Sequence, residues 1–178
     1  MQRTKLELFL INLAGGVAVL GSYAYGLLTH PGRGNELWGG VPDGLQGVYG
    51  ISMLLAAAGY LLFFFHVVVR MRPEEVKLFR GLPFRFFHVL FGMILLPSSL
   101  WMTLTFAYLD TPTTLLWLAV RLVLALVALG SLLMLIALAQ LRRRAPDQFW
   151  WPSVLGAALF TFHTLVLDAL LWPALFPV

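Results

Sequence analysis

Five long apolar stretches constrain the fold of this chain more than any other feature of its sequence. A helix needs about 20 mostly apolar residues to cross the roughly 30 Å of hydrocarbon in a bilayer. Runs such as ALVALGSLLMLIALA meet that length and lack the alternation that strands of a membrane barrel show. The sequence therefore predicts an all-α bundle of five transmembrane helices, at about Leu8–Leu28, Leu45–Val69, Phe86–Leu109, Thr114–Leu141 and Phe149–Phe176.

The rest of the chain is too short for a soluble domain. Of the 178 residues, 60% are hydrophobic and 11% are charged, whereas about 25% of the residues in soluble domains are charged. The connections between the apolar stretches cover residues 30–44, 70–85, 110–113 and 142–148. The chain has no cysteine, which excludes disulfides, thiolate metal sites and cysteine nucleophiles. We therefore expect residues 1–178 to form a single transmembrane domain.

Positive residues predict the orientation of the bundle. Ten of the twelve Lys and Arg residues fall on one side of a five-span chain: Arg3, Lys5, Arg70, Arg72, Lys77, Arg80, Arg85, Arg142, Arg143 and Arg144. The other side has Arg33, and Arg121 lies inside a span. Because cytoplasmic connections are rich in Lys and Arg, we expect a cytoplasmic N-terminus, an external C-terminus and an inner membrane of bacterial type. Membrane lipids are the expected partners of these cations, and nucleic acid is not.

Arg121 is a charged residue within the fourth apolar stretch and needs a partner there. An arginine at the centre of a membrane helix costs about 2.5–3.5 kcal/mol on insertion scales. Asp168 lies at a similar depth in the fifth stretch, and the connection between the two stretches is short. We therefore predict a buried Arg121–Asp168 ion pair, with Thr164 one turn away on the same helix face. The alternative is that Arg121 extends to the outer headgroups and pairs with Asp110.

The first outer connection and the start of the next helix predict a structured loop. The stretch THPGRGNELWGGVPDGLQGVYG has seven glycines and two prolines, together with the apolar residues Trp38, Val41 and Leu45. We expect this loop to fold back over the outer end of the bundle as a lid. The sharper hypothesis is a ligand pocket beneath it, lined by Arg121, Asp168, His163, Thr164, Tyr23, Tyr49 and Trp38. The alternative is an ordinary loop with tyrosines at the membrane interface.

Two histidines lie at matching depth near the cytoplasmic ends of their spans. His66 is in the second apolar stretch and His88 is in the third. Such a pair can ligate a b-type haem or a metal ion. Histidines hydrogen-bonded to carbonyls or phosphates at the interface are the more common case, so no cofactor is expected and these two residues are only weak metal-ligand candidates.

Polar and small residues predict how the helices pack. We expect His163 to bond across the bundle to a hydroxyl of the third span, at Ser98, Ser99 or Thr103. Small residues let helices approach closely in membranes. The segments AGGVAVLGSYAYG and GVYGISMLLAAAG therefore predict close packing between the first and second helices.

Three functions are compatible with these patterns. The favoured one is a non-enzymatic membrane protein that binds or translocates a small hydrophobic or amphipathic molecule in an inter-helix pocket open to the outer side. The alternative is an accessory subunit of a larger membrane complex, or a homo-oligomer. The third is a haem- or metal-dependent membrane redox protein. No nucleophile, base and acid can be assembled from the spacing, so catalysis is the least favoured role.

The expected architecture resembles, in outline, the tryptophan-rich translocator family, whose members also have five helices and a substantial first loop. The proline–tryptophan pattern of that family is not reproduced here, so no site residue is carried over from it.

Overall fold

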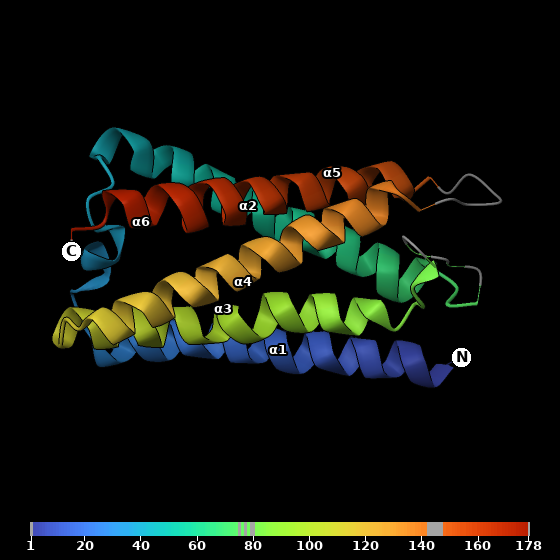
Figure 1. The fold of residues 1–178 in the computed structure, drawn as a ribbon, viewed down its shortest axis with the longest axis horizontal. Helices are drawn as coiled ribbons and strands as arrows, with labels where there is room; N and C mark the ends of the chain where they lie inside the picture. Colours follow the sequence, from blue (N-terminus) through green and yellow to red (C-terminus); the bar gives the residue numbers. More distant parts are fainter. Residues whose placement is uncertain (1, 75, 77, 79–80, 142–147, 178) are drawn as a thin grey trace.

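The computed structural model describes residues 2–74, 76, 78, 81–141 and 148–177, and this part of the chain consists of helices and their connections (Figure 1). Five helical stretches are long and apolar enough to cross a membrane, which confirms the predicted number. The elements in chain order are α1 (Gln2–Thr29), η1 (Gly34–Trp38), α2 (Asp43–Phe65), η2 (His66–Arg70), α3 (Phe86–Asp110), α4 (Thr114–Ala139), α5 (Trp150–Thr161), η4 (Phe162–Leu171) and α6 (Trp172–Leu175).

The helix boundaries agree with the apolar stretches to within two residues, except that α1 begins at Gln2, six residues before the predicted Leu8. One further difference is in the type of helix. The third helix ends at Asp110, one residue beyond the prediction, and Thr113 caps the fourth by accepting a hydrogen bond from the N–H of Leu116 at 3.2 Å. The fifth stretch is not one regular α-helix. Its middle, Phe162–Leu171, is a π-helix, and η2 at the end of the second stretch is another.

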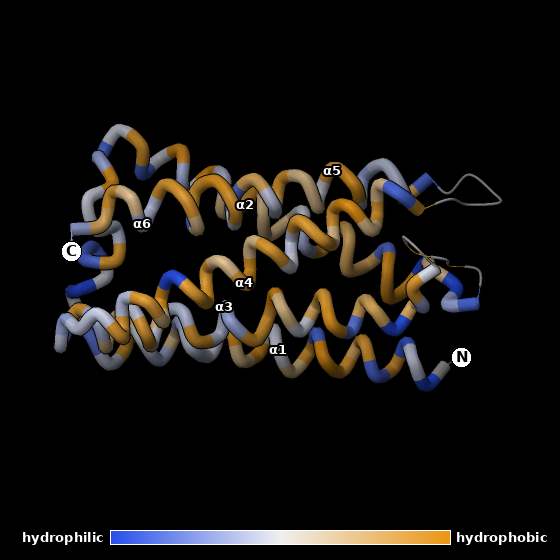
Figure 2. Tube along the Cα trace, in the orientation of Figure 1, coloured by the Kyte–Doolittle hydropathy of each residue, from blue (hydrophilic) through white to orange (hydrophobic). Residues whose placement is uncertain are grey.

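The polar residues gather at the two ends of the bundle, as a membrane protein requires (Figure 2). One end holds η1, the α3–α4 turn and α6, and we name it the loop end. The N-terminus, the end of η2 and the end of α4 lie at the other end, which we name the N-terminal end (Figure 1). Arg3, Lys5, Arg70 and Arg85, near the ends of α1, η2 and α3, are therefore at the same end as the N-terminus. Arg142, Arg143, Arg144, Lys77 and Arg80 lie outside the described residues.

The helices are not packed in chain order. α1 packs on α3, α3 packs on α4, and α4 packs on both α5 and η4, while α2 packs on α5. α1 meets the second span in the N-terminal half, where the Tyr60 hydroxyl donates to Oδ1 of Asn12 at 2.5 Å and Lys5 donates to the carbonyl of Val69 at 2.8 Å. The prediction that α1 and α2 pack closely is therefore wrong.

Small residues do allow a close contact, but between α2 and α5. A Cβ added to Gly156 would lie 2.6 Å from the carbonyl oxygen of Gly59, and a Cβ on Gly59 would collide with the carbonyl of Gly156. Two glycines of α1 also mark a close contact, but with α3. A Cβ on Gly15 would lie 2.7 Å from the Leu95 side chain and one on Gly26 would lie 2.7 Å from that of Met102, whereas Gly16 and Gly21 meet nothing within 4 Å. The small residues of α1 therefore pack against α3, and the prediction was wrong about the partner helix.

The buried core has two parts. In the N-terminal half, Phe63, Phe87 and Phe91 are fully buried among aliphatic side chains. In the loop-end half, the core is aromatic, and the rings of Trp172 and Phe176 pack at a tilt with 4.5 Å between their centroids. The candidate site lies beside this second, aromatic core.

Candidate functional site

Asp168 and His163 form the centre of the candidate site. Both residues belong to η4, and Nε2 of His163 lies 3.6 Å from Oδ2 of Asp168. Neighbours on an α-helix surface are three or four residues apart, so residues five apart would point in different directions. A π-helix bonds each N–H to the carbonyl five residues earlier. The π-helical geometry of η4 therefore places His163 and Asp168 on one side of the chain.

Side chains from two other helices hold η4 in this geometry. The Tyr49 hydroxyl of α2 donates to the carbonyl of Leu167 at 3.0 Å, and that carbonyl also accepts the N–H of Trp172. From α4, Ser131 is hydrogen-bonded to the Thr164 hydroxyl at 2.8 Å. Each of these polar groups is thus satisfied inside an apolar bundle, where an unpaired one would be costly.

His163 is oriented by both of its ring nitrogens. Nδ1 lies 3.1 Å from the Ser52 hydroxyl of α2, and Nε2 faces Asp168. The prediction that His163 bonds across the bundle to the third span is therefore wrong about its partner. Ser98 and Ser99 instead donate to the carbonyls of their own helix, at Ile94 and Leu96.

Aromatic side chains lie beside His163 and Trp172, on either side of Asp168 in the chain. Tyr49 of α2 lies edge-on to the His163 ring, with 6.5 Å between centroids. The Tyr23 ring packs edge-on against Trp101 of α3 at 6.0 Å, and Trp101 lies 6.0 Å from Trp172, one turn beyond Asp168. The indole N–H of Trp101 is buried and has no hydrogen-bond partner among the described residues. We name Asp168, His163, Tyr23, Tyr49 and Trp101 the Asp168 site.

The Asp168 carboxylate is reachable from outside the bundle. Its side chain is 32% exposed, whereas that of His163 is 11% exposed. In the loop-end half, α1 stays with α3 while α2 stays with α5, and α1 and α2 lie apart (Figure 1). About a third of the Asp168 side chain is therefore accessible from outside the bundle.

The predicted Arg121–Asp168 ion pair is absent. The side chain of Arg121 is exposed on α4, and within the described part of the chain it makes no ion pair. Asp168 faces His163 instead, and Asp110, the alternative partner, pairs with His30 and Arg33. The prediction assumed α-helical geometry up to Asp168, whereas η4 is π-helical and places the Asp168 carboxylate beside His163. Thr164, predicted to join the pair, bonds to Ser131.

The loop between α1 and α2 is structured, and it packs against the C-terminal residues. Trp38 lies edge-on to Tyr49 at 6.1 Å, and the indole N–H of Trp172 donates to the carbonyl of Leu37 at 2.9 Å. A Cβ on Gly40 would collide with the carbonyl of Leu175. Trp38 thus reaches the Asp168 site through Tyr49.

An ion-pair network fastens the same loop to the end of α3. Arg33 donates to Asp110 at 2.6 Å and to both oxygens of Glu36 at 2.9 and 2.8 Å. His30 stacks on Phe106 with 4.1 Å between centroids and lies 3.3 Å from Oδ2 of Asp110. The hydrogen bonds from Arg33 lower the pKa of Glu36, and those to Glu36 and Asp110 raise the pKa of Arg33.

The two histidines of the N-terminal end occupy different surroundings. His66 is fully buried in η2. His88 lies near the start of α3, with Nδ1 3.1 Å from the carbonyl of Arg85 and Nε2 3.8 Å from Oε2 of Glu7. Among the described residues, no group of three or more His, Asp or Glu side chains is placed to hold a metal ion.

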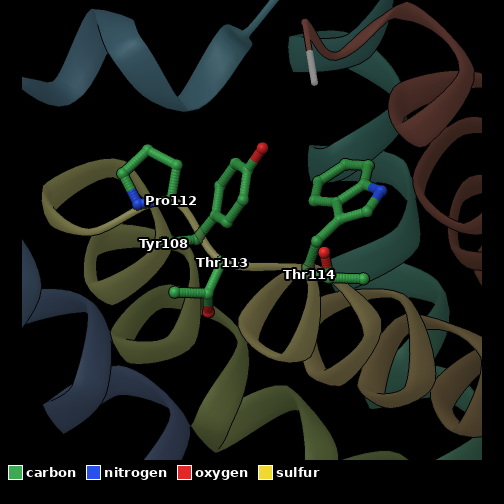
Figure 3. Close-up of a pocket in the computed structure, with 5 residues that line it drawn as sticks. Tyr108, Pro112, Thr113 and Thr114 are labelled. Atoms are coloured by element: carbon green, nitrogen blue, oxygen red, sulfur yellow. The ribbon is translucent and has the colours of Figure 1, made fainter.

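A separate pocket of about 230 Å³ opens at the loop end, beside the α3–α4 turn. The rings of Tyr108 and Pro112 lie on one side of the turn, and Thr113 projects on the other (Figure 3). The lining is completed by Thr114 and Trp117. None of the residues predicted to bind a ligand lines this pocket, so its position was not foreseen.

Comparisons with known proteins find no counterpart. No family model, no curated protein and no solved structure matches this chain. The outline resemblance to the tryptophan-rich translocator family therefore stays limited to the number of helices and the substantial first loop.

Proposed function

We propose that this chain is an integral membrane protein that binds or translocates a small amphipathic molecule at the Asp168 site. The main observation in support is that the side chain of Asp168 is 32% exposed although it lies on a helix apolar enough to cross a membrane. A charged side chain within such a helix is costly, and those that occur mark substrate or ion pathways. A carboxylate oriented by His163 and still reachable from outside suits that role.

The composition of the Asp168 site favours an amphipathic occupant. Asp168 offers acceptor oxygens, and the buried indole N–H of Trp101 offers a donor that no described residue uses. The rings of Tyr23, Tyr49 and Trp101 supply apolar surface. Binding sites for small molecules are mostly apolar with a few placed polar groups, which matches this set.

In the proposed orientation, the loop end faces outward and the N-terminal end faces the cytoplasm of a bacterial-type inner membrane. The distribution of Lys and Arg supports this orientation. The occupant then reaches Asp168 from the outer half of the bilayer.

Native mass spectrometry of the gently solubilised protein tests the proposal. We expect the wild-type chain to carry a small bound molecule, which Asp168→Asn removes because the amide keeps the shape and loses the charge. The matched control is Asp43→Asn, which changes a carboxylate at the start of α2 that bonds to Gln46. A wild-type chain without any bound molecule, or equal retention in Asp168→Asn, would contradict the proposal.

A subunit of a larger complex is the second candidate, and α1 is the observation that favours it. Only 11% of the residues in the most apolar segment of α1 are buried, and α3 is the main helix that packs against it. In the same spectrum, a stoichiometric partner chain or a homo-oligomer would support this function. A haem mass would support the third, haem-dependent function, with His66 and His88 as the ligands to mutate first.

A further inference from the structure

The local charge around Asp168 narrows the class of molecule that the site takes. Among the residues that the structure describes, no Lys or Arg lies within ion-pair distance of this carboxylate. His163, whose Nε2 is 3.6 Å away, is charged only when it is protonated. An ionised carboxylate in a low-dielectric region requires a nearby positive charge or must take up a proton. The site therefore has an acidic group without a permanent positive neighbour.

The aromatic rings beside Asp168 are the second element of the argument. Ring faces attract cations, and tryptophan does so best. Tyr23 and Trp101 come from α1 and α3, and Tyr49 comes from α2, where it is 6.5 Å from the ring of His163. A carboxylate among aromatic rings from three helices has the composition that recognises ammonium groups.

The exposure of the Asp168 side chain is the third element. It is 32% exposed on a helix apolar enough to cross a membrane. An occupant that reaches Asp168 from the bilayer must be soluble in lipid, and it must carry a positive charge to pair with the carboxylate.

We propose that the occupant is a lipophilic organic cation, whose positive centre pairs with the Asp168 carboxylate between the rings of Tyr23, Tyr49 and Trp101. This inference rests on the proposed function. His163 positions the carboxylate, and its own orientation is set by Ser52.

Two probes of matched size and opposite charge test this proposal, the tetraphenylphosphonium cation and the tetraphenylborate anion. Binding to the full chain in a neutral maltoside detergent is measured by equilibrium dialysis against empty micelles. We expect saturable binding of the cation, at least tenfold tighter than that of the anion. Asp168→Asn should weaken cation binding at least tenfold, and Asp43→Asn should leave it unchanged. Trp101→Leu should weaken it several-fold, and Trp101→Phe less.

The outcomes separate the inference from the function on which it rests. Equal binding of both probes would keep an amphipathic site and overturn the cation. Unchanged cation binding in a monodisperse Asp168→Asn protein would overturn the role of Asp168. Saturable binding of neither probe would contradict both the inference and the proposed function. The comparison of the two probes needs only the wild-type chain, so it stands even if a variant fails to fold.

Discussion

Asp168 and Arg121 show which part of the candidate site the sequence could predict. Asp168, His163, Tyr23 and Tyr49 could be chosen as candidate site residues from the sequence, because each is polar in or beside an apolar stretch. Their partners were not, because a span that is apolar throughout gives no sign of where α-helical geometry becomes π-helical. Ser52 was missed although it lies three residues after Tyr49 on the same helix, a spacing that places both on one face.

Arg121→Leu should be tolerated, because Arg121 is exposed and makes no ion pair within the described residues. We expect the free energy of unfolding to change by less than about 0.5 kcal/mol, as for other surface substitutions. Reversible unfolding in mixed micelles measures this change. A loss of about 3–5 kcal/mol, typical of breaking a buried pair, would show that Arg121 and Asp168 are coupled after all.

The Arg33–Glu36 ion pair should make the loop sensitive to acid. Because Arg33 lowers the pKa of Glu36 in the folded chain, the pair stabilises the loop above the ordinary glutamate pKa of about 4.3. That stabilisation is lost as the pH falls through the lowered pKa. We expect amide-exchange protection of residues 34–41, corrected for intrinsic rates, to fall between pH 5 and pH 3. Glu36→Gln should reduce this pH dependence, and an unchanged profile would argue against the pair.

At the scale of elements, the lengths of the apolar stretches predicted the five helices. The small residues led to a wrong prediction of which helices pack against each other. The five spans follow from hydropathy, because length and apolarity are properties of each stretch alone. Packing is a property of two surfaces. Glycines occur on α1, α2 and α5, and only the structure distinguishes Gly59 and Gly156, which meet, from Gly16, which meets nothing within 4 Å.

Gly156→Ala should destabilise the bundle more than Gly16→Ala. The added methyl group at position 156 would lie 2.6 Å from the Gly59 carbonyl oxygen, so α2 and α5 must separate. Overpacking of this kind costs roughly 1–3 kcal/mol. Gly16→Ala is the matched control, because its methyl group enters open space. Thermal unfolding of both variants in the same detergent decides the matter, and equal midpoints would contradict the α2–α5 contact.

At the scale of the whole molecule, an odd number of spans places the two termini at opposite ends (Figure 1). Among the described residues, Arg3, Lys5, Arg70, Arg72 and Arg85 lie at or near the N-terminal end, and in the proposed orientation this end is cytoplasmic. The loop end is instead organised around Trp172 and Phe176, which pack against the loop and α4. The two ends therefore differ in chemistry, one being cationic and the other aromatic.

Reporter fusions should confirm the direction. A reporter joined after residue 144 is expected in the cytoplasm, and one joined after Val178 outside it, because an odd number of spans precedes only the second. An alkaline phosphatase, active outside, and a fluorescent protein, active inside, give opposite readings at each position. The same compartment for both fusions would rule out five spans.

The pairing of α2 with α5 has a consequence for how the chain is made. Helices enter the membrane in the order of synthesis, so α2 is inserted long before its main partner exists. Until the last span arrives, the surface around Gly59 is covered only by lipid or by an insertion factor, and the loop still lacks Trp172 and Leu175 beneath it. The C-terminal residues thus complete a structure begun near the N-terminus. If synthesis stops before Trp150, the product contains α2 without the α5 surface on which it packs. Membrane proteases remove incompletely packed products of this kind.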